Sequence, residues 1–165
     1  MKNAVRFLIL LMVLPAIARD KACAAAEYGQ FDFWIGEWEV YAGDQLAGHN
    51  TITPVMNGCV LQEHWKGASG SEGMSLNFYN PTTKKWRQNW VWKNGTPLPT
   101  LTGGFADGKM TLKGESKDKD GKTVIDRITW SDNKDGTVRQ LWEKSTDGGK
   151  TWKVSFDGLY KKKKE

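Results

Sequence analysis

From Phe31 onward the chain is a succession of short segments in which apolar and polar residues alternate, and this alternation most constrains its fold. In the first segment, FDFWIGEWEV over 31–40, every second residue from Trp34 to Val40 falls on one face. Glu37 and Glu39 fall on the other face. A period of two is typical of a β-strand with one buried face.

The alternation predicts ten short strands, over 34–41, 46–53, 59–66, 74–79, 86–92, 101–105, 110–115, 123–130, 138–143 and 152–160. The connections between them carry turn sequences that tolerate a positive φ, such as Asn94-Gly95, Asp107-Gly108 and Asp135-Gly136. Short connections make consecutive strands antiparallel neighbours, and closure removes the two free edges of the sheet. We therefore expect an all-β fold, an antiparallel up-and-down β-barrel of about 8–10 strands, with a two-sheet sandwich as the alternative.

The amino-terminal residues have the pattern of a secretory signal peptide. Lys2 and Arg6 precede an apolar run over 7–17, which is shorter than the about 20 residues that span a bilayer. Small residues offer cleavage after Ala18 or after Ala26, and the second site lies closer to the strands. The expected organisation is a signal peptide over 1–26, one barrel domain over 27–160 and a basic tail over 161–165. Such a protein is periplasmic or secreted, without a transmembrane segment after processing; an uncleaved membrane anchor is the alternative.

The net charge of +5 lies at the two ends of the chain. Residues 1–26 carry +3 and residues 161–165 carry another +3, so the stretch between them carries −1. No basic stripe interleaved with aromatic residues runs along the strands, as nucleic-acid binding requires. We therefore expect no nucleic-acid partner and a solvated lysine run at the carboxyl terminus.

Whether the two cysteines, Cys23 and Cys59, can pair depends on where the signal peptide is cleaved. Cleavage after Ala26 would leave Cys59 alone, as a small apolar residue on a strand face. Cleavage after Ala18 would keep both, and an oxidising compartment would permit a disulfide bond between them. The sequence leaves both outcomes open.

Nine tryptophans are distributed over this chain of 165 residues, nearly all on the more apolar face of their strand. Such a ring either fills the barrel core or lines an aromatic pocket, and its N–H needs an acceptor when buried. We expect core filling for most of the nine and a pocket wall for two or three.

Taking the more apolar face of each strand as inward leaves four polar side chains inside: Glu63, Gln88, Asp126 and Gln140. The same rule turns inward Met74, Leu76 and Phe78 on one strand, and Trp152, Val154, Phe156 and Tyr160 on the last. An unpaired polar group in apolar surroundings costs about 1–3 kcal/mol. The four polar residues therefore need partners, either one another, indole N–H groups or a ligand.

Convergent polar groups within aromatic walls are typical of small-molecule sites, and a barrel of about eight strands encloses room for one small ligand. The candidate ligand-binding residues are Glu63, Trp65, Gln88, Trp90, Trp92, Asp126 and Gln140, and the expected ligand is apolar or aromatic. Two other functions stay open. One is a hydrolase-type enzyme that uses Glu63 and Asp126. The other is a structural or partner-binding module whose tryptophans form a solid core.

No familiar catalytic or cofactor signature occurs in the sequence. It has no Gly-x-Ser-x-Gly elbow, phosphate loop or dinucleotide fingerprint. His49 and His64 lie on the polar face of separate strands, and no second ligand follows at a metal-binding spacing. We therefore assign no catalytic residue, no metal and no cofactor.

Several motifs together resemble a known family: FDFWIGEW over 31–38, Gly58-Cys59 followed by Glu63 and Trp65, Trp86-x-Gln88-x-Trp90, and the closing Asp-Gly-Gly-Lys-Thr-Trp hairpin. They resemble secreted bacterial proteins of unknown function that are grouped with the calycin or lipocalin-like barrels. The resemblance covers essentially the whole chain after the signal peptide, and it implies a lipocalin-like barrel without an established substrate.

The pair Gly36-x-Trp38 is similar to the Gly-x-Trp of lipocalins. In that family the tryptophan plugs the closed end of the barrel, and a basic residue from a late strand stacks on it. The resemblance implies these roles for Trp38 and Arg139.

The stretch from Ser145 to Trp152 fits the Asp-box pattern Ser-x-Asp-x-Gly-x-Thr-Trp of sialidase propeller blades. A propeller needs repeated blades, and this chain has a single copy. We interpret the motif as a local hairpin in which Asp147 accepts hydrogen bonds from the turn backbone and Trp152 packs beneath.

Overall fold

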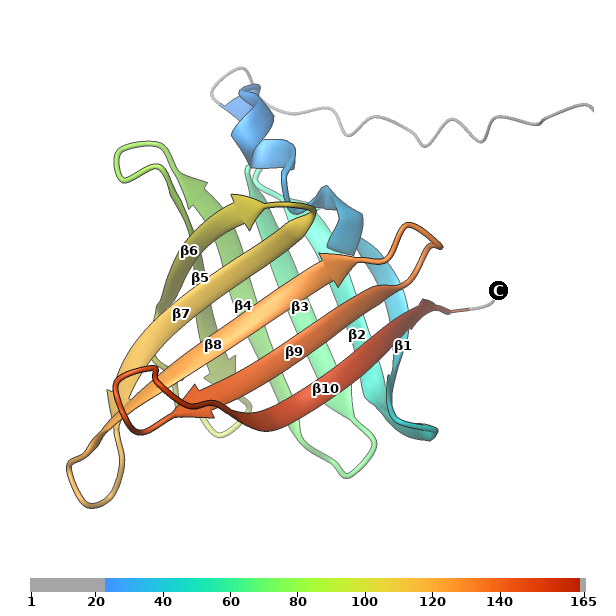
Figure 1. Ribbon diagram of the computed structural model, residues 1–165. Coiled ribbons are helices and arrows are strands. Elements are labelled where there is room, and N and C mark those ends of the chain that lie inside the picture. Colours follow the sequence, from blue (N-terminus) through green and yellow to red (C-terminus); the bar gives the residue numbers. More distant parts are fainter. Residues whose placement is uncertain (1–22, 164–165) are drawn as a thin grey trace, which may run out of the picture.

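Ten antiparallel strands close into an up-and-down barrel in the computed structural model, which describes residues 23–163 (Figure 1). Each strand pairs with its neighbours in sequence, and β1 pairs with β10 to close the ring. The strands are β1 (Gly36–Ala42), β2 (Gln45–Val55), β3 (Val60–Gly67), β4 (Glu72–Asn80), β5 (Lys85–Trp92), β6 (Leu101–Ala106), β7 (Lys109–Lys117), β8 (Thr123–Asp132), β9 (Val138–Ser145) and β10 (Lys153–Lys162). The predicted all-β barrel is confirmed, and the two-sheet sandwich is excluded.

Tight turns join the strands where the sequence predicts them. Between β6 and β7, Asp107 and Gly108 both adopt positive φ, 51° and 73°, as the two central residues of a primed hairpin turn do. Such a turn matches the twist of the flanking strands, so β7 folds back directly on β6. Eight of the predicted strands start within one residue of the observed positions.

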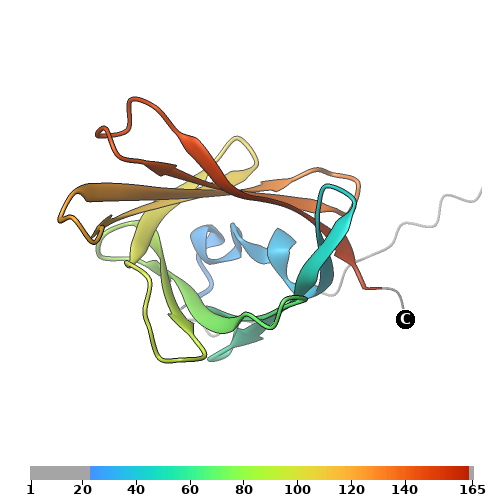
Figure 2. The same cartoon turned by 90° about the horizontal axis from the view of Figure 1, so that it is seen from below.

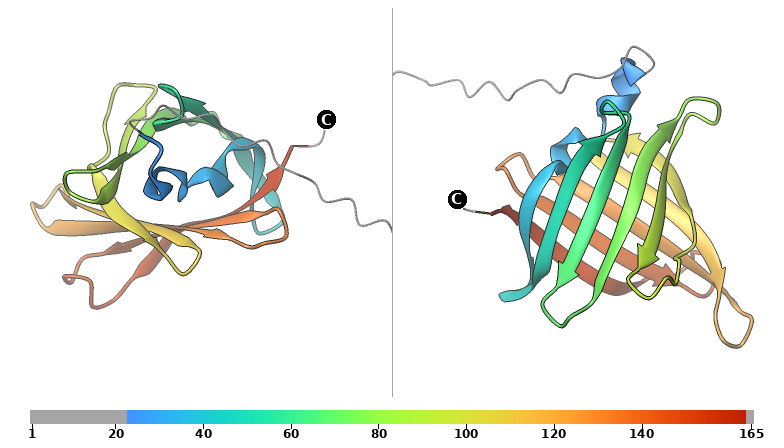
Figure 3. Two further views of the ribbon diagram at one scale, coloured as in Figure 1. Left: turned by 90° about the horizontal axis from the view of Figure 1, so that it is seen from above. Right: turned by 180° about the vertical axis from the view of Figure 1, so that it is seen from behind.

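Two short 3-10 helices, η2 (Ala26–Gly29) and η3 (Asp32–Trp34), lie across one end of the barrel (Figures 1 and 3). Trp34 was expected to begin the first strand, but it ends η3, and β1 begins at Gly36. The tight turn carries the rings of Phe31 and Trp34 into the barrel, where both are fully buried and stack at 4.8 Å between centroids. No helix within 23–163 is long and apolar enough to cross a membrane.

The rings at this end form the main aromatic cluster, which we call the packed end: Phe31, Trp34, Trp38, Trp86 and Trp130. Phe31 contacts Trp86 and Trp130 edge to face, with centroids 5.6 and 5.2 Å apart. The indole N–H of Trp38 donates to the carbonyl oxygen of Trp34 over 2.8 Å, and Trp38 is only 2% exposed. Trp38 therefore plugs this end of the barrel.

The basic residue on Trp38 is Lys162 rather than Arg139. The Lys162 ammonium lies 3.8 Å from the centroid of the Trp38 ring and donates to the carbonyl oxygen of Ile35 over 2.6 Å. A side chain at Gly36, whose φ is +137°, would collide with this ammonium. Arg139 points outward because it alternates with the inward Val138 and Gln140, and it forms a bidentate pair with Asp157.

A disulfide bond joins Cys23 to Cys59, with the two Cα atoms 5.4 Å apart. It ties the amino-terminal arm to the residue just before β3. Cleavage after Ala26 would remove Cys23 and with it this bond, whereas cleavage after Ala18 would keep it; both cleavage sites stay predictions. Most of the predicted signal peptide, residues 1–22, lies outside the described part of the chain, as do residues 164 and 165, and β10 continues through Lys162.

The inward face of β4 is the opposite of the one predicted. Met74 and Leu76 are 42% and 47% exposed, whereas Ser75 and Asn77 are buried. The reason lies in the register, because Ser75 pairs with Glu63 of β3 and directly opposed residues point to the same side of a sheet. The buried carboxyl group of Glu63 needs hydrogen-bond donors, and the polar face of β4 supplies them.

The last strand also departs from its predicted face. The register with β9 shifts between Val154 and Phe156, which is a β-bulge that leaves Ser155 unpaired. Phe156 and Tyr160 point inward as predicted, but Trp152 lies on the outer surface and Val154 is 63% exposed. A strict period of two across a bulge assigns the residues before it to the wrong face.

Candidate ligand-binding cavity

A cavity of about 490 Å³ occupies the barrel at the end opposite to the packed end. Figure 2 looks into the barrel from this side, with η2 and η3 beyond the ring of strands. The β3–β4 and β5–β6 connections contribute to its lining through Ser69 and Leu98, and β2 contributes through its first residue, Gln45. Deeper lining residues include Glu63, Trp65, Gln88, Trp90, Trp92, Ile128, Gln140, Trp142, Phe156 and Tyr160.

Four tryptophans and Phe156 form the aromatic walls of the cavity. Trp90 and Trp92 meet edge to face at 5.0 Å, and Trp65 faces Phe156 at 6.4 Å. Gly73 of β4 leaves the space in which the Trp90 indole lies, because a Cβ there would collide with the ring. The N–H of Trp90 is buried and has no hydrogen-bond partner among the described residues.

A chain of hydrogen-bonded side chains lies between the cavity and the packed end, and we call it the polar belt: Gln140, Tyr160, Asn50, Glu63, Gln88, Ser75 and Asn77. Its centre is Glu63, which accepts from Asn50 over 2.8 Å, from Ser75 over 2.5 Å and more distantly from Gln88 over 3.4 Å.

On one side of this centre, Asn50 also donates to the Tyr160 hydroxyl over 3.2 Å, and that hydroxyl donates to Gln140. On the other side, Asn77 donates to the Ser75 hydroxyl over 2.8 Å. The belt therefore joins side chains from β2, β3, β4, β5, β9 and β10.

The carboxyl group of Glu63 has three neutral partners and no cationic one among the described residues. Burial raises the pKa of Glu63 from 4.5 to about 7, and hydrogen bonds from Ser75 and Asn50 oppose this rise. Burial also raises the pKa of Tyr160 well above 10, so its hydroxyl stays neutral. Glu63 can therefore change its charge near neutral pH, which an exposed glutamate does not do.

Six of the seven predicted site residues line this one cavity, and Asp126 does not. Asp126 points inward from β8, but its carboxylate accepts the N–H of Trp142 over 2.6 Å and lies 3.6 Å from the Lys144 ammonium. These two partners satisfy the carboxylate locally. Asp126 and Glu63 therefore do not face a common space.

Sequence reasoning did not select Asn50, Ser75 or Tyr160 as site residues. The inward face of β2 is Gly48, Asn50 and Ile52, which is too weakly apolar to be recognised from hydrophobicity alone. Ser75 was not selected because the larger apolar residues of β4 lie on the opposite face of that strand, which the prediction therefore took as the inward face. The only available signal was Glu63 itself, since a buried acid requires donors on the adjacent strands.

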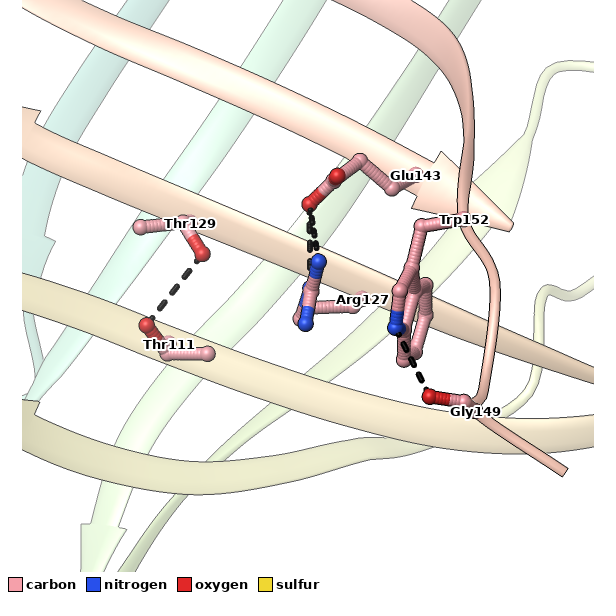
Figure 4. A network of polar contacts seen from close by, with 6 residues as sticks. All are labelled: Thr111, Arg127, Thr129, Glu143, Gly149 and Trp152. Atoms are coloured by element: carbon pink, nitrogen blue, oxygen red, sulfur yellow. Dashed lines mark hydrogen bonds and ion pairs between the residues drawn. The ribbon is translucent and has the colours of Figure 1, made fainter. Parts of the chain in front are cut away.

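No residue of the Asp-box hairpin lines the cavity, and Figure 4 shows Trp152 of this hairpin beside Arg127 and Gly149. Asp147 accepts hydrogen bonds from the Thr151 hydroxyl, from the backbone N–H groups of Thr151 and Lys150 and from the Ser145 hydroxyl, and these lower its pKa. Trp152 donates to the Gly149 carbonyl oxygen over 3.0 Å, and its ring centroid lies 3.8 Å from the Arg127 guanidinium. The interpretation of this motif as a local hairpin is confirmed.

No three His, Cys, Asp or Glu residues of the described chain gather as a metal site would require. His49 is exposed, and His64 pairs with Glu72 on the outer surface over 2.8 Å. No protein-family model matches the sequence, and no curated protein matches it either. The ten-stranded antiparallel barrel is consistent with a calycin-like barrel.

Proposed function

We propose that this protein is an exported binding protein that holds one small apolar or aromatic molecule in its barrel. The observation that carries the proposal is the cavity of about 490 Å³ with four tryptophans and Phe156 in its walls. Ligand sites in proteins are about 300–1,000 Å³, mostly apolar, with a few polar groups that orient the ligand. Here the polar groups are those of Glu63, Gln88, Gln140 and Tyr160 at the closed end.

The unpartnered N–H of Trp90 supports the same proposal. Buried polar groups in folded proteins nearly always have a partner, so an orphan in a cavity wall calls for a ligand atom or an ordered water. Export is supported by the signal-peptide pattern and by the disulfide bond, which is typical of an oxidising compartment.

Titration with a panel of fatty acids, retinoids and aromatic metabolites, followed by tryptophan fluorescence, tests the proposal. We expect a saturable change for at least one apolar compound, with binding about tenfold weaker, or 1.4 kcal/mol, in Trp90→Ala. The matched control is Trp152→Ala, which removes the same side chain on the outer surface and should leave affinity unchanged. The absence of any saturable change over this panel and over apolar amines and alcohols would refute the proposal.

The hydrolase alternative lacks an observation in its favour, because Asp126 lies outside the cavity lining and is held by Trp142 and Lys144. Turnover of any ester or glycoside that disappears in Glu63→Gln would revive it. The solid-core alternative is at odds with the cavity, although it describes the packed end well.

A further inference from the structure

The side chains that line the cavity have an unusual charge composition. The chain has 24 lysines and arginines, yet none of those within residues 23–163 lines the cavity, and neither does His49 or His64. Among the described residues, Glu63 is the only acidic one in the lining, and Tyr160 is the only other lining residue that titrates. A ligand in this cavity therefore meets one acid and no compensating cation.

Glu63 still has an acceptor position to offer. A carboxylate has about four lone-pair positions, two on each oxygen. The Oε1 atom of Glu63 accepts from Asn50, and Oε2 accepts from Ser75 and, at 3.4 Å, from Gln88. One position on Oε1 is thus unused, and the side-chain oxygen of Gln88 accepts nothing from residues 23–163. The closed end of the cavity is suited to an N–H donor.

The aromatic walls of the cavity also favour a positively charged ligand. The faces of tryptophan rings carry negative potential and attract organic cations, most strongly where water is excluded. Trp65, Trp90, Trp92 and Trp142 all line the cavity. The Trp142 ring already has a cation nearby, the Lys144 ammonium 5.0 Å from its centroid, and Lys144 is not among the lining residues. A cation inside would meet both these rings and the carboxylate.

We propose that the ligand is a hydrophobic amine in its ammonium form, with its charged head at Glu63 and its apolar body between the tryptophan rings. This inference rests on the proposed function and names its ligand class. A fatty acid or another carboxylate fits poorly, because its charge would lie beside a buried acid without any lysine or arginine.

Binding of such an amine is linked to the proton on Glu63, because the ammonium pairs with the ionised carboxylate. Tyr160 of β10 and Asp126 of β8 also point into the barrel. The Tyr160 hydroxyl stays neutral, and the Asp126 carboxylate lies 3.6 Å from the Lys144 ammonium. Below pH 7 the amine must displace a proton from Glu63, whose pKa is about 7. Affinity should therefore fall by about tenfold from pH 8 to pH 6.

Calorimetric titration with three matched probes tests the inference: 4-phenylbutylamine, 4-phenylbutanol and 4-phenylbutyrate. At pH 8 we expect the amine to bind at least tenfold more tightly than the alcohol, and the acid most weakly. Only the amine should lose affinity at pH 6. Equal affinity of amine and alcohol, or tightest binding of the acid, would overturn the amine inference while leaving the proposed function standing. No binding of these probes or of the wider panel would defeat the proposed function itself.

The decisive variant is Glu63→Gln, in which the amine should bind no better than the alcohol and should lose its pH dependence. Glu37→Gln is the matched control, since Glu37 lies on the outer face of β1 with a side chain that is 65% exposed. It should leave the order of the three probes unchanged. If Glu63→Gln fails to fold, the probe series and its pH dependence in the unaltered protein decide the question alone, and a flat pH profile for the amine would overturn the inference.

Discussion

The two ends of this barrel use the same residue type for opposite purposes. At the packed end, Trp34, Trp38, Trp86 and Trp130 are at most 2% exposed and lie against one another and Phe31. At the open end, four further tryptophans are only half buried and surround the cavity. The difference arises because the chain enters the barrel at one end only, where η3 carries Phe31 and Trp34 inward. A tryptophan on a strand is therefore buried in the core at the end where the amino-terminal segment packs against it, and it lines a cavity at the end where no described segment does.

The largest difference between the ends should appear in stability. Trp38→Ala empties a buried aromatic site at the packed end and should lower the free energy of unfolding by about 3–5 kcal/mol. Trp92→Ala at the open end should cost about 1 kcal/mol or less, because its ring already borders a cavity. Denaturant unfolding of both variants measures these two changes in the free energy of unfolding. Similar values at the two positions would contradict the distinction between a packed end and an open end.

The polar belt between the ends should make stability depend on pH. Unfolded Glu63 ionises near 4.5, whereas folded Glu63 keeps its proton until about pH 7. The folded state therefore binds more protons over this interval, and stability should fall as pH rises from about 5 to about 7, by about 3 kcal/mol in total.

This loss should be absent in Glu63→Gln and retained in Glu37→Gln. Because other titrating groups are common to both variants, the difference between their stability curves isolates Glu63. Parallel curves from pH 5 to pH 8 would mean that the belt holds Glu63 ionised.

The smallest effect is expected outside both ends. Trp152→Ala removes the ring that covers Arg127 on the outer surface and should cost about 1 kcal/mol, the order of an exposed cation–π contact with some lost packing. Ligand affinity should be unchanged. A shift in affinity together with lost stability would show that the hairpin is coupled to the cavity.

Much of the barrel was predictable because strands with one buried face must alternate, and turn chemistry separated them clearly. The prediction of six cavity-lining residues came from the same rule, since Glu63, Gln88 and Gln140 interrupt otherwise apolar faces. The rule is wrong where polar side chains are buried because a buried acid needs their hydrogen bonds. On β4, Ser75 and Asn77 face inward to serve Glu63, and hydrophobicity alone favours Met74 and Leu76.

Other differences between the prediction and the structure could not be predicted by considering one strand at a time. The bulge at Ser155 inverts the face of Trp152, but nothing in the local sequence marks it. Trp34 ends a 3-10 turn, yet it points to the same side as Trp38, as it would in a strand. The burial of its side chain was therefore predicted, and its backbone conformation was not. The role of Lys162 depends on pairing between the first and last strands, which brings residues 38 and 162 together only after closure.

That closure sets an order of events for the folding chain. Every strand pairing except one joins sequence neighbours, and these hairpins can form locally as the chain lengthens. The pairing of β1 with β10 spans nearly the whole described chain, so a nascent polypeptide that lacks its last strand carries two unpaired edges, on β1 and β9. Until Tyr160 and Lys162 have been added, the barrel has a seam that can accept a strand from another molecule. Protection against such mispairing therefore depends on the last ten residues of the barrel being synthesised and docked.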